Sequence, residues 1–260
     1  MAKTSRRRTR PSYRAAQPGG PGSGSQYGGR AAAAPRSGDR VGVPLLPITL
    51  AGLAVGLLLV AFLALGNNPP AGPLATPAAS YPAENPDHSL GSLDAPVLLQ
   101  EYADFQCPAC KAYTQTVEPR VIETYIKTAK VRIVFHNFVF IGPESTLAAT
   151  AALCAGEQGH FWVYHGYLYA NQRGENSGTF TSALLDEIAR TIGLDVSAFD
   201  SCIAGPTERA KVTADTNEAE QAGIDRTPTL VVGNHAPVTG VPSWDAFSAI
   251  IQAELVAAGG

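Results

Sequence analysis

Cysteine is scarce in this sequence, with only four in 260 residues. A chain of this length and hydrophobicity buries a sufficient core without disulfides, so the cysteines are not needed merely for folding. A second Cys-x-x-C motif and a suitably spaced histidine pair, which are typical of zinc sites, are missing. A glycine-rich phosphate loop and paired catalytic carboxylates are missing as well. We therefore expect neither a metal nor a cofactor, which leaves thiol chemistry as the main candidate.

Positive charge is concentrated at the N-terminus and sparse elsewhere. Residues 1–44 contain nine of the 19 basic residues but only one of the 22 acidic ones. This segment is rich in Arg, Gly, Ser, Pro and Ala and poor in large apolar residues, so we expect a disordered tail. An arginine-rich arm is compatible with nucleic-acid binding, but a topology signal that rests on anionic lipid is the simpler interpretation. No nucleic-acid partner is therefore expected.

The basic tail is followed by an apolar run without ionisable groups, L-L-P-I-T-L-A-G-L-A-V-G-L-L-L-V-A-F-L-A-L at residues 45–65. At about 1.5 Å per residue, this run reaches about 31 Å as a helix, which matches the hydrocarbon core of a bilayer. Because the basic flank is N-terminal, the positive-inside rule leaves residues 1–44 in the cytoplasm and residues 66–260 outside. We therefore predict a single-pass protein of the cell membrane with an extracellular or periplasmic domain.

Two other interpretations of the N-terminal region stay open. A-L-G at residues 64–66 is an acceptable cleavage site, although the apolar run is longer than that of an ordinary signal peptide. S-R-R at residues 5–7 resembles a twin-arginine signal. In such a signal the apolar segment follows the arginines closely, whereas here more than thirty residues separate them. An uncleaved membrane anchor is the interpretation that the length of the run favours.

Residues 66–92 are rich in proline, and we expect them to form a semi-rigid spacer without core residues. A folded domain is predicted over residues 93–255. Its first strand, V-L-L-Q-E-Y, leads into a helix that contains C-P-A-C and is kinked at Pro119. The further expected elements are a strand at 131–135, helices near 144–157, 160–170, 181–193, 197–204 and 206–222, a strand at 229–233 with a hairpin partner at 237–240, and a serine-capped helix at 243–255. We therefore predict β-α-β and β-β-α units around a helical insertion at about 142–222.

Two thiols lie three residues apart at the start of the first predicted helix, in F-Q-C-P-A-C-K at residues 105–111. Cys107 is placed at the N-cap and Pro108 at the first helical position. The Cys107 sulfur then faces the unpaired amides of Ala109 and Cys110, which together with the helix dipole stabilise a thiolate. Cys107 is therefore the expected nucleophile, and Cys110, one turn into the helix, is the expected resolving thiol.

This element order and these motifs resemble the DsbA-like branch of the thioredoxin superfamily over residues 90–255. The residues that carry the resemblance are Glu101, F-Q-C-P-A-C at 105–110 and R-T-P-T at 226–229. The resemblance implies an α/β fold that is thioredoxin-like with an inserted helical domain, here preceded by a single transmembrane helix. It also implies that the chain is an enzyme that exchanges thiols and disulfides.

The resemblance implies roles for three further residues. The Thr227–Pro228 peptide bond is expected to be cis, which turns the Thr227 backbone outward so that a substrate segment pairs with it like an added strand. Glu101 is expected to be buried, to have a raised pKa and to exchange a proton with Cys110 through a water. An exposed strand glutamate is the alternative for Glu101.

Ala109 departs from the most oxidising members of the family, which have histidine at this position. Alanine supplies neither a side-chain donor nor positive charge beside Cys107, so we expect a weaker oxidant. Asp104 is expected to raise the pKa of the thiolate, and Lys111 either adds positive potential or is solvated. The direction of electron flow therefore stays open.

Cys154 and Cys202 lie on two different segments of the helical block. In an oxidising compartment, an even number of thiols suggests a structural disulfide between them. Closing a loop of about 48 residues would stabilise the fold by roughly 4 kcal/mol on the chain-entropy model. Two separately buried free cysteines are the alternative.

We predict a membrane-anchored thiol-disulfide oxidoreductase that forms disulfides in exported proteins through Cys107 and Cys110. The resemblance implies recharging by a quinone-linked membrane oxidase of the DsbB or vitamin K epoxide reductase type. A disulfide reductase or isomerase is the alternative within the same chemistry. A non-catalytic binder, a holdase for unfolded exported chains, is the alternative from another class, and it would not need a reactive Cys107.

Overall fold

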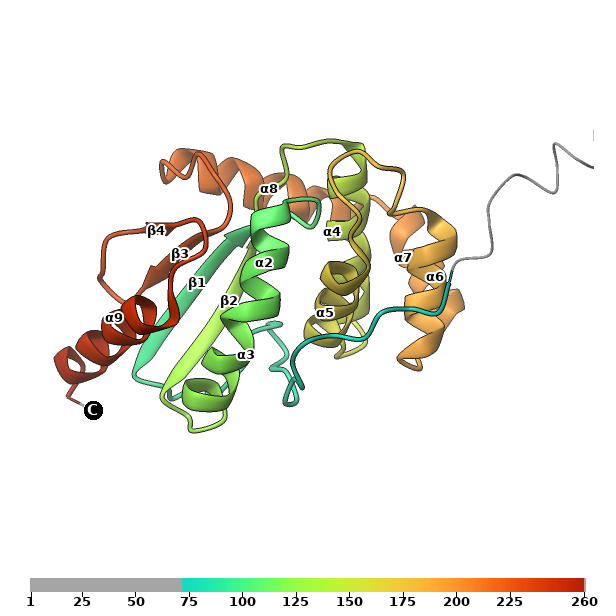
Figure 1. The fold of residues 1–260 in the computed structure, drawn as a ribbon. Coiled ribbons are helices and arrows are strands. Elements are labelled where there is room, and N and C mark those ends of the chain that lie inside the picture. Colours follow the sequence, from blue (N-terminus) through green and yellow to red (C-terminus); the bar gives the residue numbers. More distant parts are fainter. Residues whose placement is uncertain (1–71, 260) are drawn as a thin grey trace, which may run out of the picture. The chain divides into compact units, whose positions relative to one another are not determined.

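The computed structural model describes residues 72–259 (Figure 1). Its centre is a four-stranded sheet in the order β2-β1-β3-β4. β1 and β2 run parallel, whereas β3 is antiparallel to both of its neighbours. The strands are β1 at Val97–Ala103, β2 at Val131–Asn137, β3 at Thr229–Val232 and β4 at Val238–Thr239. The predicted β-α-β opening and the later β-β-α unit are therefore confirmed.

The two parallel strands bury every second residue. Leu99 of β1 and Ile133 of β2 face each other in the ladder at 0% and 1% exposure. The same alternation assigns Glu101 to a buried position, opposite Phe135. Because strand side chains alternate with a period of two, register alone carries this acidic residue into the core.

The connection from β1 to β2 is a helix in three pieces. α2 spans Pro108–Thr116, α3 spans Glu118–Val121, and a π-helical turn, η1, spans Ile122–Ile126. The first break falls at Val117, two residues before Pro119. Proline has no N–H to continue the helical ladder and its ring crowds the preceding turn. The kink predicted at Pro119 is confirmed.

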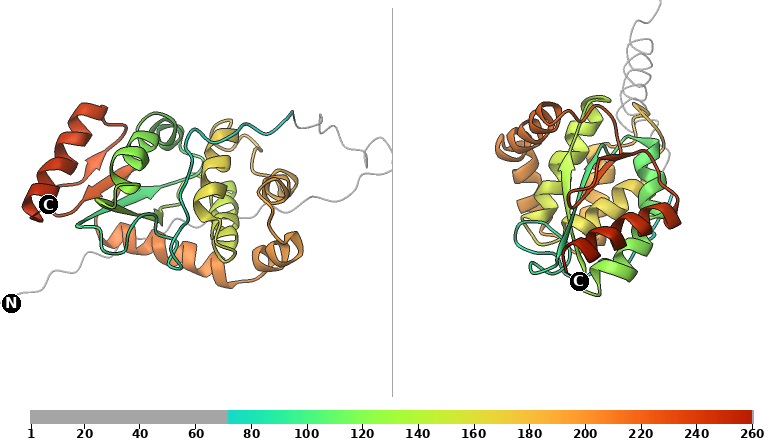
Figure 2. Two further views of the ribbon diagram at one scale, coloured as in Figure 1. Left: turned by 90° about the horizontal axis from the view of Figure 1, so that it is seen from below. Right: turned by 90° about the vertical axis from the view of Figure 1, so that its left-hand side faces the viewer.

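Helices cover both faces of the sheet (Figure 2). α2, α3 and α9 lie on one face, and α8 lies on the other. α9 spans Trp244–Ala257 and begins at the predicted cap, Ser243, whose hydroxyl accepts a hydrogen bond from the Ala246 N–H at 3.4 Å. This arrangement shields the sheet on both sides, as parallel strands require.

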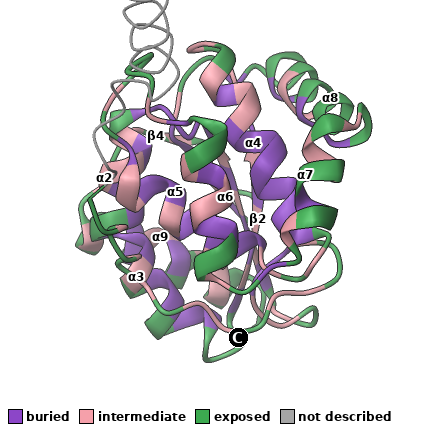
Figure 3. Cartoon of the chain, turned by 90° about the vertical axis from the view of Figure 1, so that its right-hand side faces the viewer, coloured by how far each residue is buried: buried purple, intermediate pink, exposed green. Residues whose placement is uncertain are grey.

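The inserted block has five helices within the described residues. They are α4 at Pro143–Gly156, α5 at Phe161–Asn171, α6 at Ser182–Thr191, α7 at Val196–Ala204 and α8 at Thr207–Gln221. α4 is buried along most of its length, whereas α8 exposes most of its residues (Figure 3). The alanine-rich sequence of α4 lets α5, α7 and α8 pack closely around it. All five helices fall close to the predicted segments.

A disulfide joins the central helix of this block to a peripheral one. Cys154 of α4 and Cys202 of α7 are bonded, with their Cα atoms 5.8 Å apart. The Cys154 side chain is almost completely buried, at 1% exposure. Cys107 and Cys110 are free thiols in this structure.

The segment before β1 packs along the domain (Figure 1). We call residues 77–90 the N-terminal strap. Leu90 is fully buried and exchanges two backbone hydrogen bonds of 2.9 Å with Ile133 of β2. Glu84 accepts a hydrogen bond from the backbone N–H of Trp162 at 3.0 Å. The described part of the predicted spacer therefore contributes to the core, because its few apolar residues find partners on the domain.

The transmembrane helix predicted at residues 45–65 lies outside the described residues, and so does the basic tail. Within residues 72–259, no helix combines the length and the apolar character needed to cross a bilayer.

Candidate active site

Cys107 occupies the N-cap of α2, directly after β1. Its sulfur accepts a hydrogen bond from the backbone N–H of Cys110 at 3.4 Å and lies 3.5 Å from the carbonyl oxygen of Thr227. The pKa of Cys107 falls from 9.0 to about 6, mainly through its hydrogen bond with the Cys110 side chain, while burial acts in the opposite direction. The amides of Cys110 and Ala109 also lower this pKa. The N-cap geometry therefore favours the thiolate at Cys107.

Cys110 lies one turn inside α2 and is fully buried. Burial raises the pKa of its thiol well above the usual value, and the hydrogen bond with Cys107 and the charge of that sulfur raise it further. The two pKa values thus move in opposite directions. This arrangement suits Cys107 to exchange disulfide bonds with the thiols of other molecules, whereas the buried Cys110 is suited to react only with the Cys107 sulfur.

The Thr227–Pro228 peptide bond is cis, as predicted. Pro228 is followed directly by β3, which pairs with β1 at the centre of the sheet. This connection holds the partly exposed Thr227 beside Cys107. The backbone of Thr227 is therefore positioned to contact whatever approaches the reactive sulfur.

Gln172, just after α5, clamps the turn that carries the cysteines. Its amide donates hydrogen bonds to the carbonyl oxygens of Phe105 at 2.7 Å and Cys107 at 3.0 Å. The backbone carbonyl oxygen of Gln172 accepts a hydrogen bond from the Lys111 ammonium group. Lys111 is thus held by a backbone carbonyl, and Gln172 fixes the start of α2 from the inserted block. No sequence pattern pointed to Gln172.

Asp104 organises the loops around the reactive turn. Its buried carboxylate accepts hydrogen bonds from the backbone N–H groups of Gln106 at 2.8 Å, Phe140 at 3.1 Å and Ile141 at 3.3 Å. Its backbone oxygen accepts a bond from the Cys107 N–H at 3.0 Å. Burial raises the pKa of Asp104, and the hydrogen bonds oppose this effect. Asp104 therefore ties the loop that precedes α4 to the N-terminus of α2.

Glu101 is fully buried, so the exposed alternative does not hold. Neither of its carboxyl oxygens has a hydrogen-bond partner within the described residues. Burial raises the pKa of Glu101 well above its usual value, and the nearby Glu118 raises it further. Glu118 of α3 and His165 of α5 place polar atoms within 4.8 Å of each other and of Glu101. Sequence spacing pointed to neither Glu118 nor His165, because three separate elements bring these residues together.

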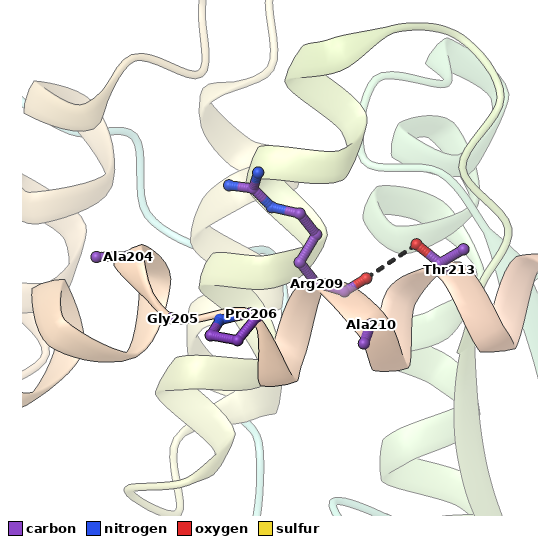
Figure 4. Close-up of a pocket in the computed structure, with 6 residues that line it drawn as sticks. All are labelled: Ala204, Gly205, Pro206, Arg209, Ala210 and Thr213. Carbon is purple, nitrogen blue, oxygen red and sulfur yellow. Dashed lines mark hydrogen bonds between the residues drawn. The ribbon is translucent and has the colours of Figure 1, made fainter.

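A shallow hollow at the junction of α7 and α8 contains none of the predicted site residues (Figure 4). Thr213 donates a hydrogen bond to the Arg209 carbonyl oxygen there at 3.0 Å. The lining residues are Ala204, Gly205, Pro206, Arg209, Ala210 and Thr213. A single exposed arginine without a nucleophile or an acid offers no chemistry that competes with the cysteine pair.

Residues 83–253 match a protein-family model described as Thioredoxin. The probable disulfide bond formation protein D of Bacillus cereus is 34% identical over 178 residues, which cover 66% of this chain and 81% of that protein. Disulfide bond formation protein D of Bacillus subtilis is 28% identical over 169 residues, which cover 64% of this chain and 76% of that protein.

A solved structure shows the same likeness. The crystal structure of oxidised BdbD from Bacillus subtilis superposes with a TM-score of 0.61 at 26% sequence identity. The alignment covers 68% of this chain and 98% of BdbD. The range matched by the family model, residues 83–253, contains the sheet, the inserted helices and the cysteine pair.

Proposed function

The chain belongs to the thioredoxin family, among the DsbA-like disulfide oxidoreductases, and from this premise we propose that Cys107 and Cys110 form disulfides in exported proteins. The observation that carries the proposal is the opposite direction of the two pKa shifts at one helix N-terminus. A thiolate stabilised at Cys107 makes the reduced pair more stable, so the oxidised pair accepts electrons from substrate thiols more readily.

The size of this effect at neutral pH is modest. A pKa lowered from 9.0 to about 6 stabilises the reduced state by about 1.4 kcal/mol at pH 7, because an ordinary thiol is still protonated there. For a two-electron couple this corresponds to roughly 30 mV. The site is therefore oxidising relative to an unperturbed dithiol, without the histidine of the strongest oxidants at position 109.

The reaction follows from the positions of the two sulfurs. A substrate thiolate attacks Cys107 of the oxidised pair, the Cys107–Cys110 bond breaks, and Cys110 leaves as a thiolate that takes up a proton. A second substrate thiolate then attacks the substrate sulfur of the mixed disulfide and releases Cys107 as a thiolate. Two substrate thiols are oxidised to one disulfide, and the enzyme disulfide is reduced.

Substrate contact is assigned to the Thr227–Pro228 connection. The 3.5 Å approach of the Thr227 oxygen to the Cys107 sulfur supports this assignment. An extended substrate segment would pair with the Thr227 backbone and present its sulfur to Cys107. Glu101 would exchange a proton with Cys110, in keeping with its burial.

The cell membrane is the proposed location, with residues 45–65 as anchor and the catalytic domain outside. The apolar run and its basic N-terminal flank support this orientation. The reduced pair then needs an electron acceptor in the membrane, and a quinone-linked oxidase of the DsbB or vitamin K epoxide reductase type has the required chemistry. Protease added to intact spheroplasts should digest residues 66–260, and protection of this region would contradict the orientation.

A reduced substrate protein tests the proposed function. The purified full-length protein in its oxidised form should introduce disulfides into the substrate, and Cys107→Ser should abolish the reaction. Given a substrate that contains a disulfide, Cys110→Ser should trap a mixed disulfide at Cys107, because Cys107 attacks the substrate disulfide and the resolving thiol is missing. Equal oxidation by the Cys107→Ser variant would support a non-catalytic binder. Efficient reduction of substrate disulfides without net oxidation would support a reductase or isomerase.

A further inference from the structure

The core near the cysteine pair contains a buried polar cluster, formed by Glu101 of β1, Glu118 of α3 and His165 of α5. All three residues are 0% exposed. Of their six side-chain nitrogen and oxygen atoms, only Oε1 of Glu118 has a hydrogen-bond partner within residues 72–259. Buried polar atoms without partners cost free energy, so these groups need to satisfy one another.

The surroundings of the cluster are apolar and offer no compensating cation. The rings of Tyr169, Trp162 and Phe135 lie 4.9, 5.0 and 5.2 Å from the ring of His165. Within the described residues, neither carboxyl group pairs with a lysine or an arginine. Burial raises the pKa of Glu118 to about 8 and lowers that of His165 to about 3. Two carboxylates this close in a dry site cannot both ionise, so at least one keeps its proton at neutral pH.

A divalent cation is the other way to satisfy two carboxylates and an imidazole. A cation would take one nitrogen of His165 and leave the other ring nitrogen protonated. Neither ring nitrogen has an acceptor within residues 72–259, whereas a ligand histidine almost always donates its second N–H to a carboxylate, a carbonyl or water. A proton shared between the two carboxyl groups satisfies them without bringing a divalent charge into this apolar site.

We propose that Glu118 keeps its carboxyl proton and donates it in a hydrogen bond to Glu101 whenever Glu101 has given its own proton to Cys110. This inference rests on the proposed function and deepens it. Glu118 is a positioning residue, because it acts on the thiol only through Glu101. When Cys110 leaves as a thiolate, the proton moves from Glu101 to the Cys110 sulfur. During recharging the proton returns to Glu101, and Cys110 attacks as a thiolate.

Two buried tyrosines lie within electrostatic range of the cluster. Tyr113 follows Cys110 by three residues and lies on the same face of α2. Burial raises the pKa of Tyr113, and the charges of both carboxyl groups raise it further. Burial also raises the pKa of Tyr169, and the charges of Cys110 and Glu101 raise it further. Each phenol therefore lies within electrostatic range of the cluster. The groups that face the cluster from neighbouring elements are Tyr81, Tyr113, Thr114 and Tyr169.

The N-terminal strap fixes which oxygen of Glu118 carries the proton. The Tyr81 hydroxyl donates a hydrogen bond to Oε1 of Glu118 at 2.8 Å. The carboxyl proton is therefore left to Oε2, which lies 3.9 Å from Nε2 of His165 and has no other partner within the described residues. Gly166 of α5 permits this contact, because an added Cβ would lie 2.7 Å from the Tyr81 ring. The strap thus orients Glu118 within the cluster.

The test isolates the step in which Cys110 reacts. The full-length protein carries a mixed disulfide between Cys107 and glutathione, and release of glutathione by Cys110 is followed from about pH 5 to about pH 9. Glu118→Gln retains a hydrogen-bond donor, whereas Glu118→Met removes it at similar volume. Glu118→Gln should react within about threefold of the wild type, because its amide replaces the carboxyl proton as donor. Glu118→Met should be slowed at least about tenfold at pH 7, with its pH midpoint raised by about one unit, because the Glu101 carboxylate loses its donor.

Glu123→Gln is the matched control, since Glu123 is exposed on η1 and pairs with Lys127. It should behave as the wild type. A wild-type rate and pH midpoint in Glu118→Met would overturn the inference. Failure of the wild type to release glutathione would instead overturn the proposed function, so the two failures are distinguishable.

Infrared spectroscopy of the wild type decides the question if Glu118→Met does not fold. A C=O absorption of a buried, protonated carboxylic acid at neutral pH, weakened in Glu118→Gln and unchanged in Glu123→Gln, is the expected result. Absence of this absorption in the wild type would overturn the inference.

Discussion

The two cysteine pairs of this chain have the same chemistry available and opposite surroundings. Cys107 caps the N-terminus of α2, where backbone amides face its sulfur. Cys154 lies within α4, where the amides already serve the helical ladder, and it is bonded to Cys202 on α7. Unpaired amides stabilise a thiolate, which supports the proposed reactivity of the first pair, whereas the disulfide of the second pair cross-links two helices. Position on a helix therefore distinguishes the proposed redox pair from the disulfide-bonded pair.

The difference extends to the two members of the reactive pair. Cys107 has its pKa lowered to about 6, while burial raises the pKa of Cys110 well above the usual value. One helical turn separates the sulfur that we propose meets substrates from the one that we propose resolves the mixed disulfide. The buried thiol then needs a proton partner in the core, a need that the outer thiol does not share.

Removing the structural disulfide is expected to have the largest effect on stability. Cys154→Ala combined with Cys202→Ala opens a loop of 48 residues. The free energy of unfolding should fall by about 4 kcal/mol, because the unfolded chain regains the entropy that the cross-link removed. Urea unfolding measures this change, and substrate oxidation by Cys107 should persist. A changed redox potential of the Cys107/Cys110 pair in this variant would show that the two pairs are not separate in function.

Local motifs predicted the geometry of the Cys107/Cys110 pair. The other residues of the candidate site come together through long-range packing, which local motifs do not encode. Cys107, Pro108 and Cys110 are contiguous, so their geometry follows from how a helix begins. Glu118 and His165 belong to different helices and meet Glu101 only when the inserted block docks on the sheet. No periodicity along the chain encodes this encounter.

The N-terminal strap also formed contacts that its sequence did not predict. Residues 66–92 have the composition of a spacer, and Tyr81 and Leu90 are isolated within them. Leu90 is nevertheless fully buried, and Tyr81 donates a hydrogen bond to Glu118. Average composition over a segment therefore conceals single residues that anchor it.

An alanine at position 166 should displace the strap from α5. The added Cβ of Gly166→Ala would lie 2.7 Å from the Tyr81 ring and 2.9 Å from Pro77. Overpacking of this kind costs about 1–3 kcal/mol, so the free energy of unfolding should fall by roughly 2 kcal/mol. Gly72→Ala is the control, since nothing lies within 4 Å of the added atom. Equal stability of the two variants in urea would show that the strap contributes little.

A histidine at position 109 sharpens the comparison between the two cysteine pairs with a smaller effect. Ala109→His adds a donor, cationic when protonated, beside Cys107. A gain of about 1.4 kcal/mol for the thiolate raises the redox potential by about 30 mV, so the variant should be more oxidising. Titration against glutathione measures this potential, with Ala112→His, one turn further along α2, as the control. An unchanged or lower potential together with an unchanged pKa of Cys107 would indicate that the helix terminus does not govern the site.

The pH dependence of Cys107 alkylation in the reduced protein tests the central claim most directly. Because the pKa is lowered from 9.0 to about 6, the thiolate stabilises the reduced fold fully above about pH 9 and loses this effect as the pH falls through about 6. Mass spectrometry of the modified peptides should show a midpoint near pH 6 for Cys107 and little modification of Cys110 at any pH below 9. A midpoint near pH 9 for Cys107, or equal modification of both thiols, would contradict the account.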